Sequence, residues 1–476
     1  MNSNTKYLMK NTYLYSISMI STKLISFLMV PFYTYVLTKE DYGMIDIFTT
    51  SMNLLLPIIT LSIHQAVLRF TLEKNKDREL IFSYAFFIIC INLALFFVAS
   101  RFFTVVKFIE AYQKLLLLLF TANIIYVLLS EFTRGMEKIK DFIFGNILYV
   151  FISTALSIYT IAVLNLGIEG YLISLCTGYL SAILYFSIRI KAFTFLTYKI
   201  FKKENSIYIF EMLRYSMFLI PNALFWWITN ASDRYIILWN MGADANAIYA
   251  VANKVPAIIT TISGVFIQAW LLSAVKEQNS PDKERYYEVI FENVISFLFI
   301  LITVLIVVLK IIVKIYVADS YYSAWESGSL LLLSAGFSVL AAFIGNNYIV
   351  AKKNLGNMLS TLSGAILNIG LNIMLIPKYG LVGAGFSTYA SYLVVVIYRI
   401  IDTKKFKSSR KFFEFSSKNI ISWLLLQIQV FIISRSDNLI SNLSVLIMLG
   451  IIFLNKRFLT TIIFFIKNFI KREKKT

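Results

Sequence analysis

Apolar residues occur along this chain in windows of about 20, separated by short polar or charged segments. A bilayer core about 30 Å thick needs about 20 apolar residues per helix, so each window predicts a membrane-spanning helix. Fourteen windows are predicted, near 11–36, 43–66, 80–99, 114–133, 142–164, 168–188, 213–239, 246–274, 290–309, 328–350, 356–377, 380–399, 417–434 and 438–455. The pattern therefore predicts an all-α, multi-pass membrane protein.

The composition agrees with this interpretation. Hydrophobic residues make up 58% of the 476 positions and charged residues only 15%, whereas soluble domains carry about 25% charged residues. The first window is too long for the apolar part of a signal peptide, and no A-x-A-like cleavage site follows it. Cys90 and Cys176 both fall inside predicted spans, so we expect small buried side chains and no metal site.

The formal net charge of +19 is placed asymmetrically. With the N-terminus assigned to the cytoplasm, about three-quarters of the 45 Lys and Arg residues fall on the cytoplasmic side. Both termini are therefore predicted to be cytoplasmic, and the positive charge to attract anionic lipid headgroups. Nucleic-acid binding is excluded as the explanation, because no loop is long enough to form a soluble binding module.

The chain contains an internal repeat. The segment "LGIEGYLISLCTGYLSAILYFSIRI" (166–190) resembles "YGLVGAGFSTYASYLVVVIYRI" (379–400). At a constant offset of 213 residues, the first copy's Gly167, Gly170, Ser174, Tyr179 and Leu180 match Gly380, Gly383, Ser387, Tyr392 and Leu393. Near the other end of each copy, "YSISMIS" (15–21) resembles "YSMFLIP" (215–221).

This repeat predicts two pseudo-symmetric six-helix lobes followed by two extra helices. The N-terminal lobe covers residues 1–205, the C-terminal lobe 206–405, and residues 406–476 hold spans 13 and 14 with a basic cytoplasmic tail. Transporters are commonly built from two such bundles, with the substrate site between them near the midplane. A basic linker at 189–214 joins the two lobes on the predicted cytoplasmic side.

An acidic and a basic residue, Asp233 and Arg234, occur inside the seventh predicted span. A charged side chain at the centre of a membrane-spanning helix costs about 2.5–3.5 kcal/mol on insertion scales, so an interaction or a hydrated environment must offset the cost of this pair. It could be an interfacial anchor near the outer surface. However, Asn222, Trp226, Asn230 and Arg234 recur every four residues and form one polar and aromatic stripe. Such a stripe is more typical of a hydrated interior than of a lipid-facing surface.

Two lysines, Lys23 and Lys254, also lie inside predicted spans. Asp46 and Asp233 are the only aspartates within the spans, and neither lysine has an obvious acidic partner nearby in sequence, so these cations favour an anionic ligand from outside the protein. Gln268 is a further candidate for the same cavity, because Gln65-Ala66 recurs as Gln268-Ala269 in the second lobe. The predicted substrate-binding set is Lys23, Arg234, Lys254, Asp233, Asn230, Trp226, Asn222 and Gln268.

Other polar or helix-breaking residues carry weaker signals. Arg69 and Arg134, at cytoplasmic ends of spans, are topology anchors or candidates for a cavity entrance. The single histidine, His64, is expected to be a hydrogen-bonded packing residue, with proton coupling as the alternative. Pro57 and Pro256 are expected to interrupt spans 2 and 8, because proline removes a helical hydrogen bond.

Three segments resemble the polysaccharide flippase branch of the multidrug/oligosaccharidyl-lipid/polysaccharide exporter superfamily. They are "VPFYTYVLTKEDYGMIDIF", "RYSMFLIPNALFWWITNASDRYIILWNMGADANAIYAVANKV" and "AKKNLGNMLSTLSGAILNIGLNIMLIPKYGLVGAGFSTYASYLVVVIYR". The resemblance implies a Wzx-type flippase that moves an undecaprenyl-pyrophosphate-linked oligosaccharide across the bacterial cytoplasmic membrane. It further implies a central cationic cavity, alternating access, and an association with polysaccharide polymerase machinery.

The residues are compatible with that chemistry. A cavity with lysine and arginine would neutralise a pyrophosphate, aromatic rings would stack on sugars, and amides would bond hydroxyls. No P-loop motif is present, so a nucleotide is not the expected energy source; H⁺ or Na⁺ coupling is an alternative. The competing interpretations are a lipid II flippase, a multidrug/cation antiporter of the same superfamily, and a membrane enzyme. We expect no catalytic residues and no cofactor.

Overall fold

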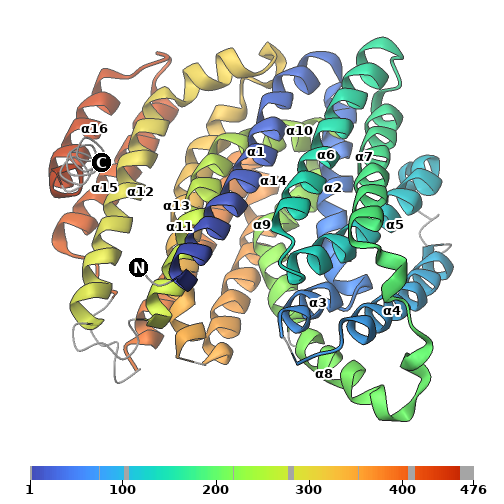
Figure 1. Ribbon diagram of the computed structural model, residues 1–476. Helices are drawn as coiled ribbons and strands as arrows, with labels where there is room; N and C mark the ends of the chain where they lie inside the picture. Colours follow the sequence, from blue (N-terminus) through green and yellow to red (C-terminus); the bar gives the residue numbers. More distant parts are fainter. Residues whose placement is uncertain are drawn as a thin grey trace, which may run out of the picture. The chain divides into compact units, whose positions relative to one another are not determined.

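The computed structural model describes residues 3–73, 75–100, 107–217, 219–276, 283–351, 353–405 and 413–460, and within these ranges it contains helices and no strands (Figure 1). The α-helices are α1 (Ser3–Val36), α2 (Lys39–Ile59), α3 (Ile63–Leu72), α4 (Arg78–Ser100), α5 (Lys107–Gly135), α6 (Ile139–Ile158), α7 (Gly167–Ile190), α8 (Ser206–Met217), α9 (Ile220–Met241), α10 (Ala243–Ala252), α11 (Lys254–Lys276), α12 (Lys283–Tyr316), α13 (Ala324–Val350), α14 (Asn354–Thr403), α15 (Ser417–Arg435) and α16 (Asn442–Leu454). Every predicted span falls on one or two of these helices. The prediction of an all-α, multi-pass membrane protein with about 14 spans is confirmed.

The chain divides into two compact units, residues 1–231 (unit 1) and 232–476 (unit 2), and the boundary between them falls within α9. The lobe boundaries predicted at 205/206 and 405/406 follow the sequence repeat and its linkers, and they stay predictions. Of the predicted basic tail, residues 461–476 lie outside the described part of the chain.

By length and hydropathy, nine described helices can cross a membrane, or ten if the bent pair α10–α11 counts as one span. The difference from fourteen has identifiable reasons. The long α14 combines two predicted spans. Of the first predicted span, the apolar stretch Ile20–Val36 is the part whose side chains the structure describes, and the last predicted span holds the short apolar helix Asn442–Leu454. The remaining helix, α9, carries the polar stripe that lowers its hydropathy.

Unit 1 packs α6 and α7 side by side (Figure 1). Its core is apolar and aromatic, and the rings of Phe82 on α4 and Phe132 on α5 lie 4.7 Å apart. Neither cysteine forms a disulfide; Cys176 is buried as expected, whereas the expectation is wrong for Cys90, which is exposed. These contacts place α3, α4, α5 and α7 around one continuous core.

The sequence repeat appears in the structure as a repeated turn. Gly167, at the start of α7, has φ +50°, and Gly380, inside α14, has φ +57° and ψ −138°. Residues with a side chain rarely adopt a positive φ, so glycine is needed at both positions. At Gly380 the backbone leaves the helical conformation, and α14 therefore consists of two helices, the predicted spans 11 and 12.

The match extends one turn beyond each glycine. Ser174 Oγ donates to the carbonyl of Gly170 at 2.6 Å, and Ser387 Oγ donates to the carbonyl of Gly383 at 2.8 Å. Two sequence-matched pairs thus make the same hydrogen bond in different units. The repeat predicted from sequence is therefore also a repeat of local geometry.

Spans 2 and 8 are both broken close to the predicted prolines. Three residues after Pro57, the chain passes through Thr60 into Leu61 and Ser62, both at positive φ, before α3 begins. Near Pro256, α10 and α11 meet at a bend of 42°. Pro256 lies in the first turn of α11, where its missing N–H is not needed.

The two extra helices attach to unit 2 through buried polar contacts. Thr303 on α12 donates to Gln429 Oε1 on α15 at 2.8 Å, and Gln429 Nε2 donates to the Ser444 carbonyl on α16 at 3.2 Å. One turn into α15, Asn419 donates to Glu292 on α12 at 2.9 Å. Figure 1 shows α12, α15 and α16 as neighbours.

Candidate functional site

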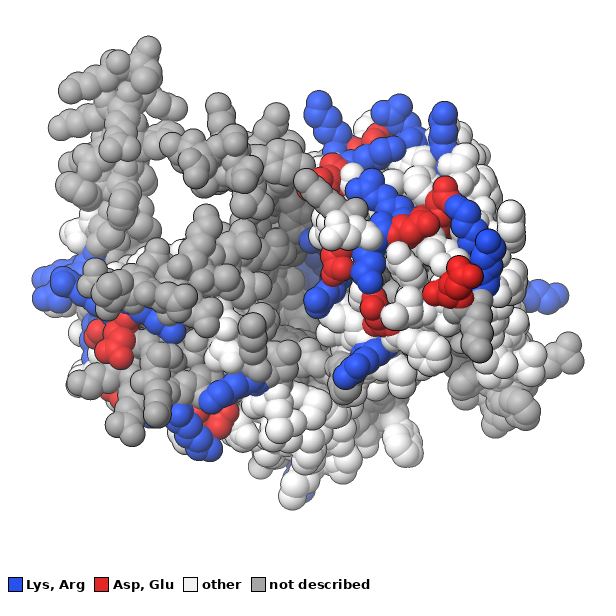
Figure 2. Space-filling view, turned by 60° about the horizontal axis from the view of Figure 1, so that its bottom comes forward, with Lys and Arg blue, Asp and Glu red and all other residues white. Residues whose placement is uncertain are grey.

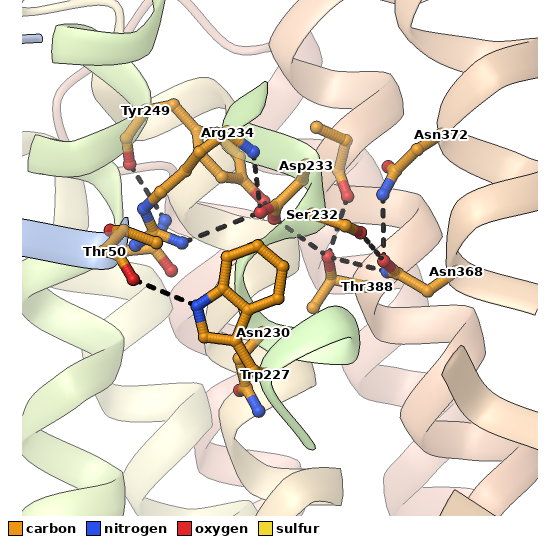
Figure 3. A network of polar contacts seen from close by, with 12 residues as sticks. Thr50, Trp227, Asn230, Ser232, Asp233, Arg234, Tyr249, Asn368, Asn372 and Thr388 are labelled. Atoms are coloured by element: carbon orange, nitrogen blue, oxygen red, sulfur yellow. Dashed lines mark hydrogen bonds and ion pairs between the residues drawn. The ribbon is translucent and has the colours of Figure 1, made fainter. Parts of the chain in front are cut away.

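The central charged residue of unit 2 is Asp233, which lies on α9 and is 2% exposed. Its carboxylate accepts a hydrogen bond from the Arg234 backbone N–H at 2.9 Å and another from Thr388 Oγ1 at 3.3 Å. The Tyr249 hydroxyl on α10 donates to the same carboxylate (Figure 3). Asp233 therefore links α9 to α10 and to the second half of α14, and its buried charge has several hydrogen-bond donors, as burial requires.

The cation next in sequence, Arg234, pairs with that carboxylate. Its Nη1 lies 3.6 Å from Asp233 Oδ1, and its guanidinium carbon lies 6.0 Å from the centre of the Tyr249 ring. Adjacent helical residues normally point apart, so the ion pair depends on the arginine side chain folding back toward the carboxylate. The Arg234 side chain remains 14% exposed.

Neutral amides and hydroxyls extend this cluster. Ser232 Oγ donates to Asn368 Oδ1 at 2.8 Å, and Asn372 Nδ2 donates to the same oxygen at 3.0 Å. Asn368 Nδ2 donates to Thr388 Oγ1 at 3.4 Å (Figure 3). Asn372 Oδ1 is buried and accepts no hydrogen bond from the described residues. We call Ser232, Asp233, Arg234, Tyr249, Asn368, Asn372 and Thr388 the Asp233 cluster.

Sequence reasoning found two members of this cluster and missed five. The missed residues are neutral, and three of them lie far along the chain on α14. One available signal was the pair Asn368 and Asn372, which stand four residues apart in an apolar span and therefore share a helical face. Nothing in the sequence indicated that this face meets Asp233.

The rest of the predicted stripe on α9 belongs to unit 1. Asn230 is exposed, and its Nδ2 donates to the Trp226 carbonyl at 2.6 Å, while Trp226 is half-buried. Asn222 Oδ1 is buried and accepts no hydrogen bond from the described residues. The neighbouring Trp227 donates its indole N–H to the Thr50 carbonyl on α2 at 3.0 Å. The indole of Trp227 is thus a structural anchor, whereas Asn230 is accessible.

Lys254 is the first residue of α11 and is half-buried. It follows directly after Asn253, which ends α10 and donates to the Tyr249 carbonyl at 2.9 Å. Lys254 thus stands at the bend where α10 ends and α11 begins. The same short helix carries Tyr249 to the Asp233 carboxylate, so Lys254 and the cluster share a support.

The other predicted cations lie in unit 1. Lys23 is exposed on α1. Arg69 pairs with Glu73 at 3.7 Å and lies 4.6 Å from the centre of the Tyr215 ring. The convergence of Lys23 with the cations of unit 2 stays a prediction, and so does the role of Arg69 at a cavity entrance.

The remaining residues singled out from the sequence are Arg134, Gln268 and His64. Arg134 pairs with Glu131 at 3.5 Å, which is compatible with either of its predicted roles. The side chain of Gln268 lies outside the described part of the structure. His64 is buried, and its Nδ1 shares a hydrogen bond of 3.0 Å with the Thr60 hydroxyl, as expected for a packing residue.

Comparison with known proteins bears on this arrangement. The profile of the family described as "Polysaccharide biosynthesis protein" matches residues 8–272. No curated protein matches the sequence. Three similar solved structures are a lipid II flippase MurJ in an inward closed conformation, a mutant of the Vibrio cholerae MATE transporter VcmN, and a MOP superfamily transporter from Pyrococcus furiosus.

The likeness covers nearly the whole chain. The MurJ structure has a TM-score of 0.63 at 14% identity, covering 97% of this chain and 100% of that one. The Vibrio cholerae transporter has a TM-score of 0.59 at 12% identity, covering 93% of this chain and 100% of that one. The Pyrococcus furiosus transporter has a TM-score of 0.55 at 10% identity, covering 90% of this chain and 97% of that one. At these identities the matches show a shared fold.

Proposed function

Because the chain belongs to the polysaccharide biosynthesis protein family, we propose that it is a flippase for an undecaprenyl-pyrophosphate-linked oligosaccharide. It moves this repeat unit across the bacterial cytoplasmic membrane by alternating access, for a surface polysaccharide such as capsule, O-antigen or exopolysaccharide. Both termini lie in the cytoplasm. The protein transports without catalysing a covalent step, and polysaccharide polymerase machinery acts on its product.

The observation that carries this proposal is a partly exposed arginine on α9 that pairs with a buried carboxylate. Arg234 retains a partly exposed side chain while Asp233 and Tyr249 fix its position. Arginine presents a planar set of donors that suits phosphate oxygens. A pyrophosphate brings about two negative charges, and neutralising them lowers the cost of moving the headgroup past hydrocarbon.

The sugar part calls for different contacts. Half-buried Trp226 and exposed Asn230 lie one helical turn apart on α9. An indole face suits stacking on a sugar ring, and an amide both donates to and accepts from hydroxyls. We propose that these residues line the same path as Arg234, together with Lys23, Lys254, Asn222 and Gln268, and that Arg69 and Arg134 lie at its cytoplasmic opening.

Ion coupling is proposed at the Asp233 cluster. The cluster combines one carboxylate with neutral oxygens on Asn368 and Thr388, and with the unused oxygen of Asn372. Hard cations such as Na⁺ prefer oxygen ligands, and a buried carboxylate also binds a proton readily. Either ion would neutralise Asp233 and weaken its hold on Arg234, which would couple ion binding to the freedom of the substrate-binding cation.

Reconstituted transport tests the proposal. The full-length protein in liposomes is expected to accelerate translocation of a fluorescent undecaprenyl-pyrophosphate oligosaccharide over protein-free liposomes, and Arg234→Ala should slow it at least about tenfold. The matched control is Arg435→Ala, since Arg435 is exposed at the end of α15. Transport of lipid II or of an organic cation, but not of the oligosaccharide, would assign the protein to one of the competing functions.

The coupling ion is tested in the same liposomes. An imposed Na⁺ gradient that drives transport at constant pH supports Na⁺, and a pH gradient that drives it without Na⁺ supports H⁺. Asp233→Asn is expected to abolish the response to the coupling gradient. Equal responses of wild type and Asp233→Asn would place the coupling elsewhere.

A further inference from the structure

The segment that joins the sixth and seventh spans, residues 191–217, forms a defined structure on unit 1, which we call the linker platform. It consists of three short 3₁₀ turns (Ala192–Phe195, Tyr198–Phe201 and Lys203–Asn205) followed by α8. The composition alternates aromatic residues with lysines. This alternation raises the question of what the platform faces.

Buried contacts fix the linker platform to the start of α4. Ser83 Oγ donates to the Phe195 carbonyl at 2.8 Å and accepts from the Thr197 N–H at 2.9 Å. The Tyr84 hydroxyl donates to the Ile200 carbonyl at 2.8 Å. The Phe195 ring lies 5.1 Å from Phe132 in the core of unit 1. One face of the platform is thus held by the protein.

Charged pairs reinforce this attachment. Lys199 Nζ lies 3.1 Å from Glu79 Oε2, and Lys76 donates to Glu211 on α8. The hydrogen bond that Lys76 donates to Glu211 raises the pKa of Lys76. Both ends of the platform are therefore tied to the α3–α4 region, and its orientation is set by the fold.

Four aromatic side chains of the linker platform are largely exposed. Phe193 is 75% exposed, Tyr198 78%, Phe201 76% and Phe210 70%. Four rings this exposed within 18 residues form an apolar patch of the kind that marks an interaction site. Since Phe195 turns inward while Phe193 and Tyr198 turn outward, the outward rings are a consequence of the way the backbone is held.

Lysines and an arginine are interspersed with these rings. Lys191, Lys199, Lys202 and Arg214 are exposed, and Glu204 is the exposed acidic residue of the platform's described side chains. Figure 2 shows Lys and Arg side chains gathered on the face of the molecule that it brings forward, with fewer Asp and Glu among them. The platform thus offers positive charge and apolar rings together.

The apolar face of the platform continues onto a membrane span. The Phe201 ring lies 6.0 Å from the ring of Phe87, an exposed residue of α4. A surface that is continuous with the side of a spanning helix meets lipid rather than a soluble partner. Aromatic rings at the headgroup level with basic residues beside them are typical of interfacial segments.

We propose that the linker platform is an anionic-lipid docking surface, which inserts Phe193, Tyr198, Phe201 and Phe210 into the adjacent leaflet and binds lipid phosphates through Lys191, Lys202 and Arg214. Under the predicted topology this is the cytoplasmic leaflet. The proposal does not depend on which substrate the protein transports. Its consequence is that the chain joining the two repeat copies is held at the membrane surface by lipid of a particular charge.

The depth of the rings is measured on the full-length protein in nanodiscs. In a Cys90→Ser, Cys176→Ser background, a bimane label on Phe193→Cys or Phe201→Cys is expected to be quenched strongly by lipids brominated near the headgroup end of the acyl chain. The control is Glu137→Cys, an exposed loop position between α5 and α6. Quenching at 193 and 201 no greater than at 137 would overturn the proposal, and this includes the case in which a protein partner occupies the patch.

The charge preference is measured with variants that keep all the rings. Lys191→Gln with Lys202→Gln is expected to lower the enrichment of phosphatidylglycerol over phosphatidylcholine around the protein by about fivefold per lysine, an effect that high salt should reduce. The matched control, Lys404→Gln with Lys405→Gln, removes the same charge from unit 2 and should lower the enrichment around the protein much less. Equal enrichment in both double variants would overturn the role of the lysines.

Discussion

The two units contain the same repeated turn but use different chemistry around it. Tyr33 of unit 1 stands 200 residues before Asp233 of unit 2, which is the offset of the matched segments 15–21 and 215–221. The Tyr33 hydroxyl shares a hydrogen bond of 3.1 Å with Ser157, and its ring packs edge-on to Tyr171 at 5.4 Å. Asp233 instead anchors an ion pair and a polar cluster. A neutral, aromatic contact in one unit thus corresponds to a charged one in the other.

A second pair of matched positions shows the same difference. Phe186 of unit 1 and Arg399 of unit 2 stand 213 residues apart, and both are almost fully buried. Each occupies the space above a glycine, since a Cβ on Gly145 would clash with the Phe186 ring and one on Gly345 with the Arg399 guanidinium. The two glycines lie on α6 and α13, which the repeat does not pair, so the matched positions differ both in their chemistry and in the helix against which they pack. Positions at which the two copies differ are therefore the first candidates for functional residues.

The largest expected effect comes from removing the charge that distinguishes unit 2. Asp233→Ala leaves Arg234 without its carboxylate and several donors without an acceptor, and should lower the free energy of unfolding by about 3 kcal/mol and abolish transport. The matched change in unit 1, Tyr33→Phe, removes one hydrogen bond and should cost about 1 kcal/mol. Thermal unfolding in detergent and the liposome assay measure both. Equal losses in the two variants would remove the functional distinction between the units.

Arg399→Lys is expected to have the second-largest effect. The guanidinium donates to Ser360 Oγ at 2.9 Å, to Thr361 Oγ1 at 3.1 Å and to the Ala341 carbonyl, and a lysine cannot reach these acceptors together. We expect a loss of about 2 kcal/mol in the free energy of unfolding, since the charge stays buried with fewer partners. Phe186→Leu, the control in unit 1, should cost about 1 kcal/mol. An unchanged free energy of unfolding in Arg399→Lys would mean that only the positive charge matters at this position.

The paired glycines Gly167 and Gly380 both have a positive φ. Gly380 combines φ +57° with ψ −138°, a conformation that is essentially confined to glycine, so Gly380→Ala should cost about 1.5 kcal/mol. Gly167 has φ +50°, and Gly167→Ala should cost about 1 kcal/mol, because a side chain disfavours a positive φ. The measurement is again thermal unfolding of purified protein. A larger loss at Gly167 than at Gly380 would contradict this ranking.

The smallest effect is expected at the matched serines. Ser174 shares a second hydrogen bond of 3.0 Å with Thr160, so Ser174→Ala should cost about 0.5–1 kcal/mol. Ser387 bonds the carbonyl one turn earlier in its own helix, a contact that adds little to stability, so Ser387→Ala should be close to neutral. Transport should be unchanged in both variants. Loss of transport in Ser387→Ala would show that the turn of unit 2 has a role beyond its shape.

The fold could be predicted from the sequence because the membrane sets the length of each apolar window. The repeat could also be recognised in the sequence, since glycines at a constant offset mark turns that need a positive φ. The candidate site could be predicted only in part. Asp233 and Arg234 were conspicuous as charges in an apolar span, whereas Tyr249, Asn368 and Thr388 are neutral and meet them only through folding. Trp227 lies beside the predicted stripe, and its role as an anchor became visible only through its bond to Thr50.

The two interrupted spans have a consequence for how the protein is made. At 1.5 Å per residue, a ten-residue helix such as α3 or α10 covers about 15 Å, half of the hydrocarbon thickness. Such a half-length helix is too short for the insertion machinery to recognise as a complete transmembrane segment. We therefore expect these pieces to enter the bilayer together with the helix that continues each of them, and biogenesis of the chain to depend on this cooperation between consecutive helices.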